Sequence, residues 1–451
     1  MPTPTFLQLH TLTSYPGTLL NRDDAGFAKR LPFGGATRTR VSSQCLKYHW
    51  RNHEGKHALY DIDFSALGDE ELSELDGEPK SLRSRETFQR CIVEPLVEEG
   101  HPAPLVRAVT FALKERLLSG GKAKKSDTKT LIAPGEDDDP RDLLDSNQVT
   151  IFGVPEVRYL RSLAAEKIES VREDFPVFWE NGEADPGDAL DKDTIADAAD
   201  AMRDISKRDL KKNLKGLRLA SGLDAALFGR MATSDVLARG DAAIHVAHAF
   251  TTHEEESESD YFSAVDQLVA DEGEGELGSG HINSQELTSG LFYGYVVVDL
   301  PLLVSNLEGV ERDDWQEADP TLAGEVLRRL VHLVTTVSPG AKLGSTAPYS
   351  HAQCLFAESG TAQPRTLANA FQNPVSKNGQ GVLEGSYEAL GQYVSEMDDM
   401  YGVLTDRRLA AMGSGADALA DDVGTAGTVP VGMIADWAAA QIPNAQSNGS
   451  S

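Results

Sequence analysis

Seven positively charged side chains lie close together near the start of the sequence, between Asn21 and Arg51, with only Asp23 and Asp24 as acidic neighbours. Seven cations against two anions give this stretch a formal charge of +5, whereas the whole chain carries −29 and the remainder therefore −34. Exposed charges act locally, because salt screens their fields beyond roughly 8–10 Å. The stretch therefore predicts a track for a polyanion, which we interpret as an RNA backbone. Its cations are Arg22, Lys29, Arg30, Arg38, Arg40, Lys47 and Arg51.

A strand and a helix are expected to position these cations. Residues 37–41 (TRTRV) alternate, which predicts a strand with Arg38 and Arg40 on the same face. The preceding FGG, residues 33–35, indicates a turn or a close approach of backbone.

The helix is expected to begin at Ser42 or Ser43, both good N-caps, whose free backbone N–H groups would form a phosphate site. Leu46 and Trp50 suit the core. The opposite, polar stripe consists of Gln44, Lys47, Tyr48 and Arg51.

Composition excludes several protein classes. An apolar content of 40% and a charged content of 25% are typical of a soluble globular protein. No apolar run approaches the roughly 18 residues of a membrane span, and no signal pattern opens the chain, so we expect a cytoplasmic protein without membrane contact. The three cysteines, Cys45, Cys91 and Cys354, are far apart, which excludes a disulfide framework and a four-cysteine zinc site.

The spacing of apolar residues predicts the elements in the middle of the chain. Residues 61–222 are largely helical in pattern, with acidic loops at 69–78 and 135–145, and residues 206–218 predict a helix with six cations against Asp209. Residues 243–286 have two strand-like ends around an acidic, glycine-rich middle, which indicates a long protruding arm.

The last third alternates between strands and helices. Residues 291–300 are the clearest buried strand, 321–337 a helix and 354–358 another strand. After Gly413 a linker-like run leads to a short helix near 433–441 and a tail. Together with a first strand at residues 5–12, these elements predict an α+β or split βαβ core.

The pattern NRDD-x4-K-x3-FGG-x2-R-x-R-V-SSQ-x-LK, residues 21–47, resembles the backbone subunit of the type I-E CRISPR Cascade complex. Further motifs follow in that family's order, so the resemblance covers most of the chain apart from the acidic insertions and the C-terminus. These motifs are GRMATSD, AIHVAHAFTTH, DYFSAVD, GSGHINSQELTSGLFYGY, SPGAK and LANAF.

The resemblance implies a hand-like α+β fold. A palm of RNA-recognition-motif (ferredoxin-like) type would comprise residues 1–60 and 286–412, a helical fingers insertion with its return to the palm 61–240, and a β-hairpin thumb 249–285. Residues 413–451 would be linker, short helix and flexible tail. Several copies would line up along one guide RNA, with target DNA and the other Cascade subunits as further partners: the guide 5′-end cap subunit, the small subunit, the large subunit and the guide-processing endonuclease.

The resemblance also assigns contacts. Tyr48 stands where the family usually has arginine, so that contact is lost or replaced by stacking. Met231 and Phe262 match two apolar wedges that displace a base at intervals. The expected guide-RNA contacts are Arg22, Lys29, Arg38, Arg40, Ser42, Ser43, Gln44, Lys47 and Arg51. The candidate DNA contacts are Lys207, Arg208, Lys211, Lys212 and Lys215.

Nothing in the sequence predicts an enzyme, a cofactor or a metal site. SGGKAKKS, residues 119–126, lacks the spacing of a nucleotide-binding loop, and His245, His248 and His253 match no strong metal pattern. Two alternatives remain open. Asp23 and Asp24 could bind Mg²⁺ in a ribonuclease on the same fold, or the chain could be an acidic scaffold without a nucleic-acid role.

Overall fold

The computed structural model describes residues 3–77, 81–179, 190–230, 236–237, 241–265, 279–378 and 381–443. The chain divides into two compact units. Unit 1 comprises residues 1–61, 244–300 and 320–451, and unit 2 comprises residues 62–243 and 301–319. The mixed α+β fold class predicted from the sequence is confirmed.

Unit 1 is built on an antiparallel sheet, with the strand order β11-β10-β1-β9-β7-β3-β2 and with β6 and β8 also paired to β9. The interior strand β1, which pairs with β10 and β9, is buried from Leu7 to Thr13, including the polar residues Gln8 and His10. The strands are β1 (Phe6–Thr18), β2 (Arg30–Phe33), β3 (Ala36–Val41), β6 (Ile244–Val246), β7 (Ala249–Thr251), β8 (Glu256–Val265), β9 (Ser279–Asp299), β10 (Cys354–Gly360) and β11 (Asp406–Ala411).

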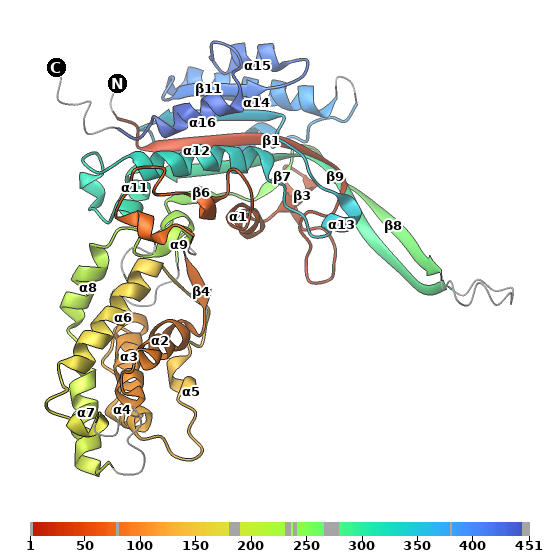
Figure 1. The fold of residues 1–451 in the computed structure, drawn as a ribbon. Coiled ribbons are helices and arrows are strands. Elements are labelled where there is room, and N and C mark those ends of the chain that lie inside the picture. Colours follow the sequence, from red (N-terminus) through yellow and green to blue (C-terminus); the bar gives the residue numbers. More distant parts are fainter. Residues whose placement is uncertain are drawn as a thin grey trace, which may run out of the picture. The chain divides into compact units, whose positions relative to one another are not determined.

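Helices cover both faces of this sheet. On one face, Trp50 of α1 (Ser43–Arg51) and Val334 of α12 (Thr321–Thr336) line a small cavity with Thr13 of β1. The neighbouring residue of β1, Leu12, packs with Leu390 of α14 (Val382–Tyr401). Because successive side chains of a strand point to opposite faces, α1 and α12 lie on one side and α14 on the other. Figure 1 shows α12 and α14 on either side of β1.

The C-terminal segment differs from the linker expected after residue 413. Residues Ala416–Asp422 form helix α15, which packs on α14 through Leu419. The short helix predicted near residues 433–441 is confirmed as α16 (Val431–Ala439), whose Ile434 is buried. Small apolar residues spaced along the helix make this packing possible, although their glycine- and aspartate-rich surroundings are typical of a linker. A short helix, α13 (Leu343–Thr346), precedes β10.

The predicted arm is a long antiparallel hairpin. β8 pairs with β9 from Glu256 opposite Ser289 to Val265 opposite Ser279. Figure 1 shows the two strands running out beyond the rest of the sheet.

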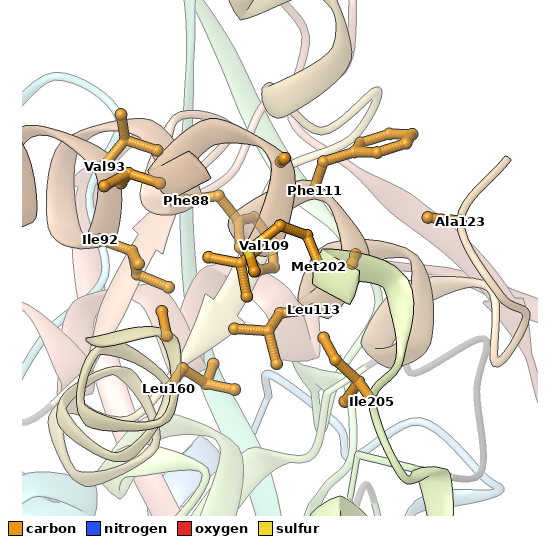
Figure 2. Packing of buried hydrophobic residues seen from close by; sticks show 14 of the residues in the cluster. Phe88, Ile92, Val93, Val109, Phe111, Leu113, Ala123, Leu160, Met202 and Ile205 are labelled. Atoms are coloured by element: carbon orange, nitrogen blue, oxygen red, sulfur yellow. The ribbon is translucent and has the colours of Figure 1, made fainter. Parts of the chain in front are cut away.

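Unit 2 is helical around its own core, as the periodicity of residues 61–222 predicted. Phe88, Val109, Leu113, Leu160 and Met202 belong to one buried apolar cluster (Figure 2). A two-stranded sheet joins β4 (Leu82–Ser84) to β5 (Thr150–Phe152). The helices are α2 (Glu94–Glu98), α3 (Ala103–Leu118), α4 (Lys125–Ile132), α5 (Arg141–Leu144), α6 (Val154–Glu169), α7 (Lys192–Arg203), α8 (Lys207–Lys215) and α9 (Gly222–Phe228), and α11 (Leu300–Glu308) begins at the end of unit 1.

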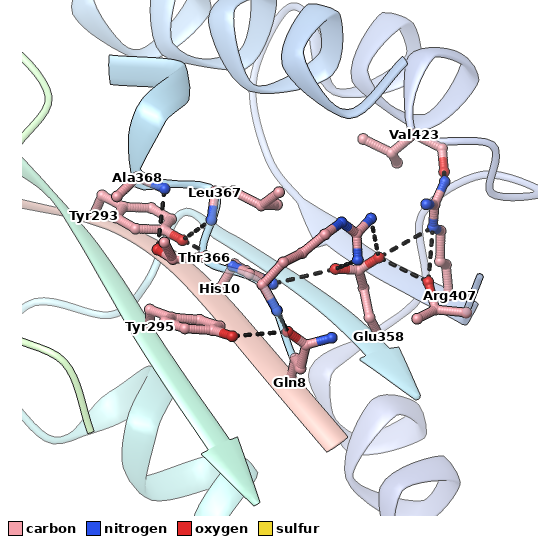
Figure 3. A network of polar contacts seen from close by, with 12 residues as sticks. Gln8, His10, Tyr293, Tyr295, Glu358, Thr366, Leu367, Ala368, Arg407 and Val423 are labelled. Carbon is pink, nitrogen blue, oxygen red and sulfur yellow. Dashed lines mark hydrogen bonds and ion pairs between the residues drawn. The ribbon is translucent and has the colours of Figure 1, made fainter. Parts of the chain in front are cut away.

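A buried polar network crosses the sheet of unit 1 (Figure 3). Tyr293 Oη accepts the N–H of Leu367 at 3.0 Å and lies 2.9 Å from His10 Nδ1, and His10 Nε2 lies 3.3 Å from Glu358. Burial lowers the pKa of His10, which leaves the ring neutral between Tyr293 and the Glu358 carboxylate. Arg365 donates to the same carboxylate at 3.1 Å. The network therefore fixes the segment around residues 365–367 against the sheet.

Acid is expected to weaken this network. Below its ordinary pKa of 6.5, His10 takes up a proton in the unfolded chain but not in the folded one, so the free energy of unfolding falls as the pH drops from 6.5. Burial acts to raise the pKa of Glu358, but the contact with His10 and the charge of Arg365 lower it to about 2. The free energy of unfolding therefore continues to fall as the pH drops below 4.5, the ordinary pKa of a glutamate.

Urea unfolding at pH values from about 7.5 to about 5.5 checks this expectation, and the loss from His10 over the first pH unit below 6.5 is at most about 1 kcal/mol, the limit for one proton. The variant His10→Gln isolates that contribution from those of the other histidines. Identical pH dependence in the variant and the natural chain would contradict the assignment.

Candidate nucleic-acid interface

A tight turn displays the first cations of the basic stretch. Asp23 Oδ1 accepts the backbone N–H groups of Ala25 at 3.0 Å and Phe27 at 2.9 Å, and the two flanks of the turn pair through Arg22 and Ala28. Arg22 is exposed at one end of this turn, and Lys29 is half-buried at the other. Asp23 therefore has a structural role in forming the turn.

The start of α1 is bonded within the protein. Ser42 is the N-cap, and its Oγ accepts the N–H of Cys45 at 3.3 Å. The N–H of Ser42 donates to Asn21 Oδ1 at 2.9 Å, and the N–H of Ser43 donates to His248 Nδ1 at 3.2 Å. The expectation that Ser42 and Ser43 offer open backbone donors must therefore be corrected, since protein side chains occupy both.

The outer stripe of α1 agrees with the prediction. Gln44 and Tyr48 are exposed, and Lys47 and Arg51 are half-buried. Burial lowers the pKa of Lys47, and the neighbouring charge of Arg51 lowers it further. A phosphate bound beside both cations would relieve this repulsion, because an anion favours the charged form of lysine. The pair therefore suits an anionic ligand.

Arg38 differs from its predicted role as a phosphate contact. Its side chain is fully buried, and its guanidinium donates to the carbonyl oxygens of Thr251 and Phe371, each at 2.9 Å. The close approach predicted for the FGG turn explains this burial: a Cβ on Gly34, where φ is +62°, would lie 1.5 Å from the carbonyl oxygen of Gln372. The segment around residue 371 thus covers Arg38.

Arg40 keeps an outward position on the same strand. It is half-buried, its Nε donates to the carbonyl of Arg30 at 3.1 Å, and its Nη1 lies 3.4 Å from His248 Nδ1. Burial lowers the pKa of His248, as do the charges of Arg40 and Lys29. The ring is therefore neutral, with Nδ1 accepting from Ser43.

The sequence analysis considered His248 only as a metal ligand and missed its role as the acceptor for the N–H of Ser43. It also missed the ion pairs of Arg30 with Glu255 and Glu286. It also missed Lys342, which lines a cleft of about 670 Å³ with Arg22 and Phe27 at the base of the hairpin. The position of Lys342 within the SPGAK motif was the available signal.

The remaining predicted residues lie elsewhere. Met231 lies outside the described residues, and Phe262 belongs to β8, opposite Asn283, with its side chain outside the description. In unit 2, Arg208, Lys211 and Lys212 are exposed on α8, whereas Lys207 and Lys215 are half-buried, and Lys215 forms an ion pair with Glu311.

The described residues contain no group of three or more His, Cys, Asp or Glu side chains placed to hold a metal ion. No helix among them is long and apolar enough to span a membrane.

Comparison with known proteins identifies the family. The model of the CT1975-like protein family matches residues 7–430, so the chain belongs to this family. None of the curated proteins matches it.

Two solved structures resemble the chain across nearly its full length. A chain described as "CRISPR RNA-guided surveillance complex, pre-nicking" is 24% identical, with 97% of this chain and 100% of that chain covered and a TM-score of 0.62. Another, described as "CRISPR RNA-guided surveillance complex", is 18% identical, with 97% and 99% covered and a TM-score of 0.50. At these identities the likeness shows a shared fold.

Proposed function

We propose that this chain is a non-catalytic, guide-RNA-binding backbone subunit of a CRISPR RNA-guided surveillance complex of the type I-E Cascade kind. The observation that carries the proposal is the cluster of outward-facing cations on the turn at residues 21–29, on β3 and on α1, in a chain whose net charge is −29. Membership of the CT1975-like family and the fold shared with chains of such complexes support it.

The strand order supports the proposed palm. Taking β1, β7, β9 and β10 as strands one to four, the order β10-β1-β9-β7 is 4-1-3-2, with α1 after the first strand and α12 between the third and the fourth. This is the arrangement of a ferredoxin-like βαββαβ unit. In the same proposal the β8–β9 hairpin is the thumb and unit 2 is the fingers insertion.

Holding phosphates is the proposed chemistry. Arg22, Lys29, Arg40, Lys47 and Arg51 would neutralise successive phosphates of one strand, with Gln44 donating a hydrogen bond. None of these contacts needs to read a base, because guide–target pairing carries the sequence information in such complexes. Several copies would follow one guide in antiviral defence, while Met231 and Phe262 displace a base at intervals. The exposed cations of α8 would hold target DNA by charge.

The proposal is tested by producing the natural chain in the cytoplasm of a bacterial host with a repeat–spacer transcript and the neighbouring subunits, and sequencing the RNA that copurifies. Guide RNA of uniform length is the expected result. Protein that purifies without RNA would contradict the proposal and favour the acidic-scaffold account.

A further inference from the structure

His248 lies in unit 1 beside the start of helix α1. It directly precedes β7, and the antiparallel pairing of β7 with β3 sets Arg40 opposite Phe250 and Val41 opposite Ala249. Because the two strands run in opposite directions, the exposed side chain of His248 comes next to the residues that follow Val41. A residue between two strands of the sheet is thus placed beside the predicted RNA contacts of α1.

The ring of His248 is held as a hydrogen-bond acceptor. Its Nδ1 lies 3.2 Å from the backbone nitrogen of Ser43 and 3.4 Å from Nη1 of Arg40. Both neighbours are donors without a lone pair, so Nδ1 carries no proton and the ring of the free protein is neutral. A protonated ring would meet the N–H of Ser43 with another N–H and would have to turn away from it.

The charges that act on the ring from the described residues are positive. Burial lowers the pKa of His248, and the charges of Arg40 on β3 and of Lys29 on the basic turn lower it further. Helix α1 presents its N-terminal end, which is the positive end of its dipole, and its first turn contains no acidic residue. The described elements packed against the ring therefore favour its neutral form.

Capping of α1 does not by itself require a histidine at this position. The adjacent N–H of Ser42 donates to Oδ1 of Asn21 at 2.9 Å, and the charge of an amide does not change. An amide would serve the N–H of Ser43 equally well. The two acceptors differ in their response to an anion: the amide stays as it is, whereas the imidazole can take up a proton.

We propose that His248 is a further RNA contact of this chain, and that it takes up one proton from solvent when a phosphate of the RNA binds between Arg40 and Lys29. The N–H of Arg40 donates to the carbonyl oxygen of Lys29 at 2.8 Å, and both charges reach the same ring. A phosphate near both cations would therefore also lie near His248. The proposal rests on the proposed function in assuming that Arg40 and Lys29 bind the guide.

Phosphate binding reverses the electrostatic environment of the ring. An anion within about 4–6 Å favours the charged form of histidine, and the imidazolium can then donate a charge-assisted hydrogen bond to a phosphate oxygen. The same step frees Nη1 of Arg40 to donate to the phosphate instead of to Nδ1. In the free protein, the neutral ring adds no further cation beside a stretch that already carries +5. The ring is thus neutral where cations repel one another and charged where an anion is present.

The test compares the pH dependence of RNA binding by the natural chain and by His248→Asn. Asparagine can still accept the N–H of Ser43 but does not titrate. Fluorescence anisotropy with a labelled oligouridylate, whose bases do not titrate in this range, measures both affinities from about pH 8 to about pH 5.5 at constant ionic strength. Raising the pKa of His248 by about one unit on binding makes the affinity about tenfold higher at the acidic end. We expect this gain in the natural chain only, and equal affinities of the two chains at pH 8.

Isothermal titration calorimetry counts the protons taken up. In two buffers of different ionisation enthalpy, the natural chain is expected to take up as much as one proton more per bound chain than His248→Asn. His351→Asn, which removes another exposed histidine of unit 1, is the matched control. It is expected to retain both the pH dependence and the proton uptake.

Two results would overturn the proposal and leave the proposed function intact. An equal pH dependence of binding in His248→Asn and the natural chain would show that another group takes up the proton. Binding weakened by the same factor at every pH would show that His248 only positions Ser43 and α1. If the natural chain binds the RNA at no pH, the proposed function itself fails, and this proposal fails with it.

Discussion

Reversing the charges of Lys47 and Arg51 is expected to lower the affinity of the chain for single-stranded RNA about 100-fold. Each charge-assisted hydrogen bond to a phosphate contributes about 1.5–3 kcal/mol, so losing two costs about 3 kcal/mol, or two powers of ten. The two side chains share the outer stripe of α1, and Arg51 already contributes to lowering the pKa of Lys47. Fluorescence anisotropy with a labelled RNA measures the affinities of the natural chain and of Lys47→Glu/Arg51→Glu.

The salt dependence of the same titrations identifies the cause. Each phosphate contact to a single strand contributes about 0.7 to the slope of log affinity against log salt, so the double variant should lose about 1.4. Lys122→Glu/Lys124→Glu changes the net charge equally at exposed positions of unit 2 and should keep the slope. An equal loss in this control would attribute binding to overall charge, and normal binding by the double variant would favour the acidic scaffold.

Local patterns were sufficient to predict the elements that carry the interface. The N-cap predicted at Ser42 or Ser43 and found at Ser42, the buried Trp50 and the exposed stripe of α1 follow from contacts between residues three or four apart, which the sequence displays directly. The same holds for the second half of β9, predicted as a strand at residues 291–300, and for α12. The helix Ala416–Asp422 was missed because its stability comes from packing on α14 rather than from its own composition.

The environment of each cation was harder to predict, because distant residues create it. Alternation placed Arg38 and Arg40 on one strand face but could not say what covers it. Phe371, which accepts from Arg38, lies 333 positions away in the sequence, and His248, which accepts from Ser43, lies 205 positions away. A periodic pattern in the sequence reports only on residues a few positions apart, so it carries no information about such contacts. The basic stretch therefore predicts a charged track but does not tell which of its cations are buried and which are exposed.

Replacing Arg38 by methionine is expected to destabilise the folded chain by about 2–4 kcal/mol, since two buried carbonyls lose their charged donor. The reduced cost of burying methionine rather than a guanidinium limits the loss to this range.

The same replacement at Arg40 provides the matched comparison, two residues away on one strand. Arg40→Met removes a half-buried side chain, so we expect the free energy of unfolding to change by less than about 1 kcal/mol and the salt slope of RNA binding to fall by about 0.7. Folded Arg38→Met should keep its slope, because a buried guanidinium contributes no phosphate contact. The opposite pattern would be an Arg38→Met chain with unchanged stability and a reduced salt slope of RNA binding. That result would mean that Arg38 contacts the RNA and is buried only in the free protein.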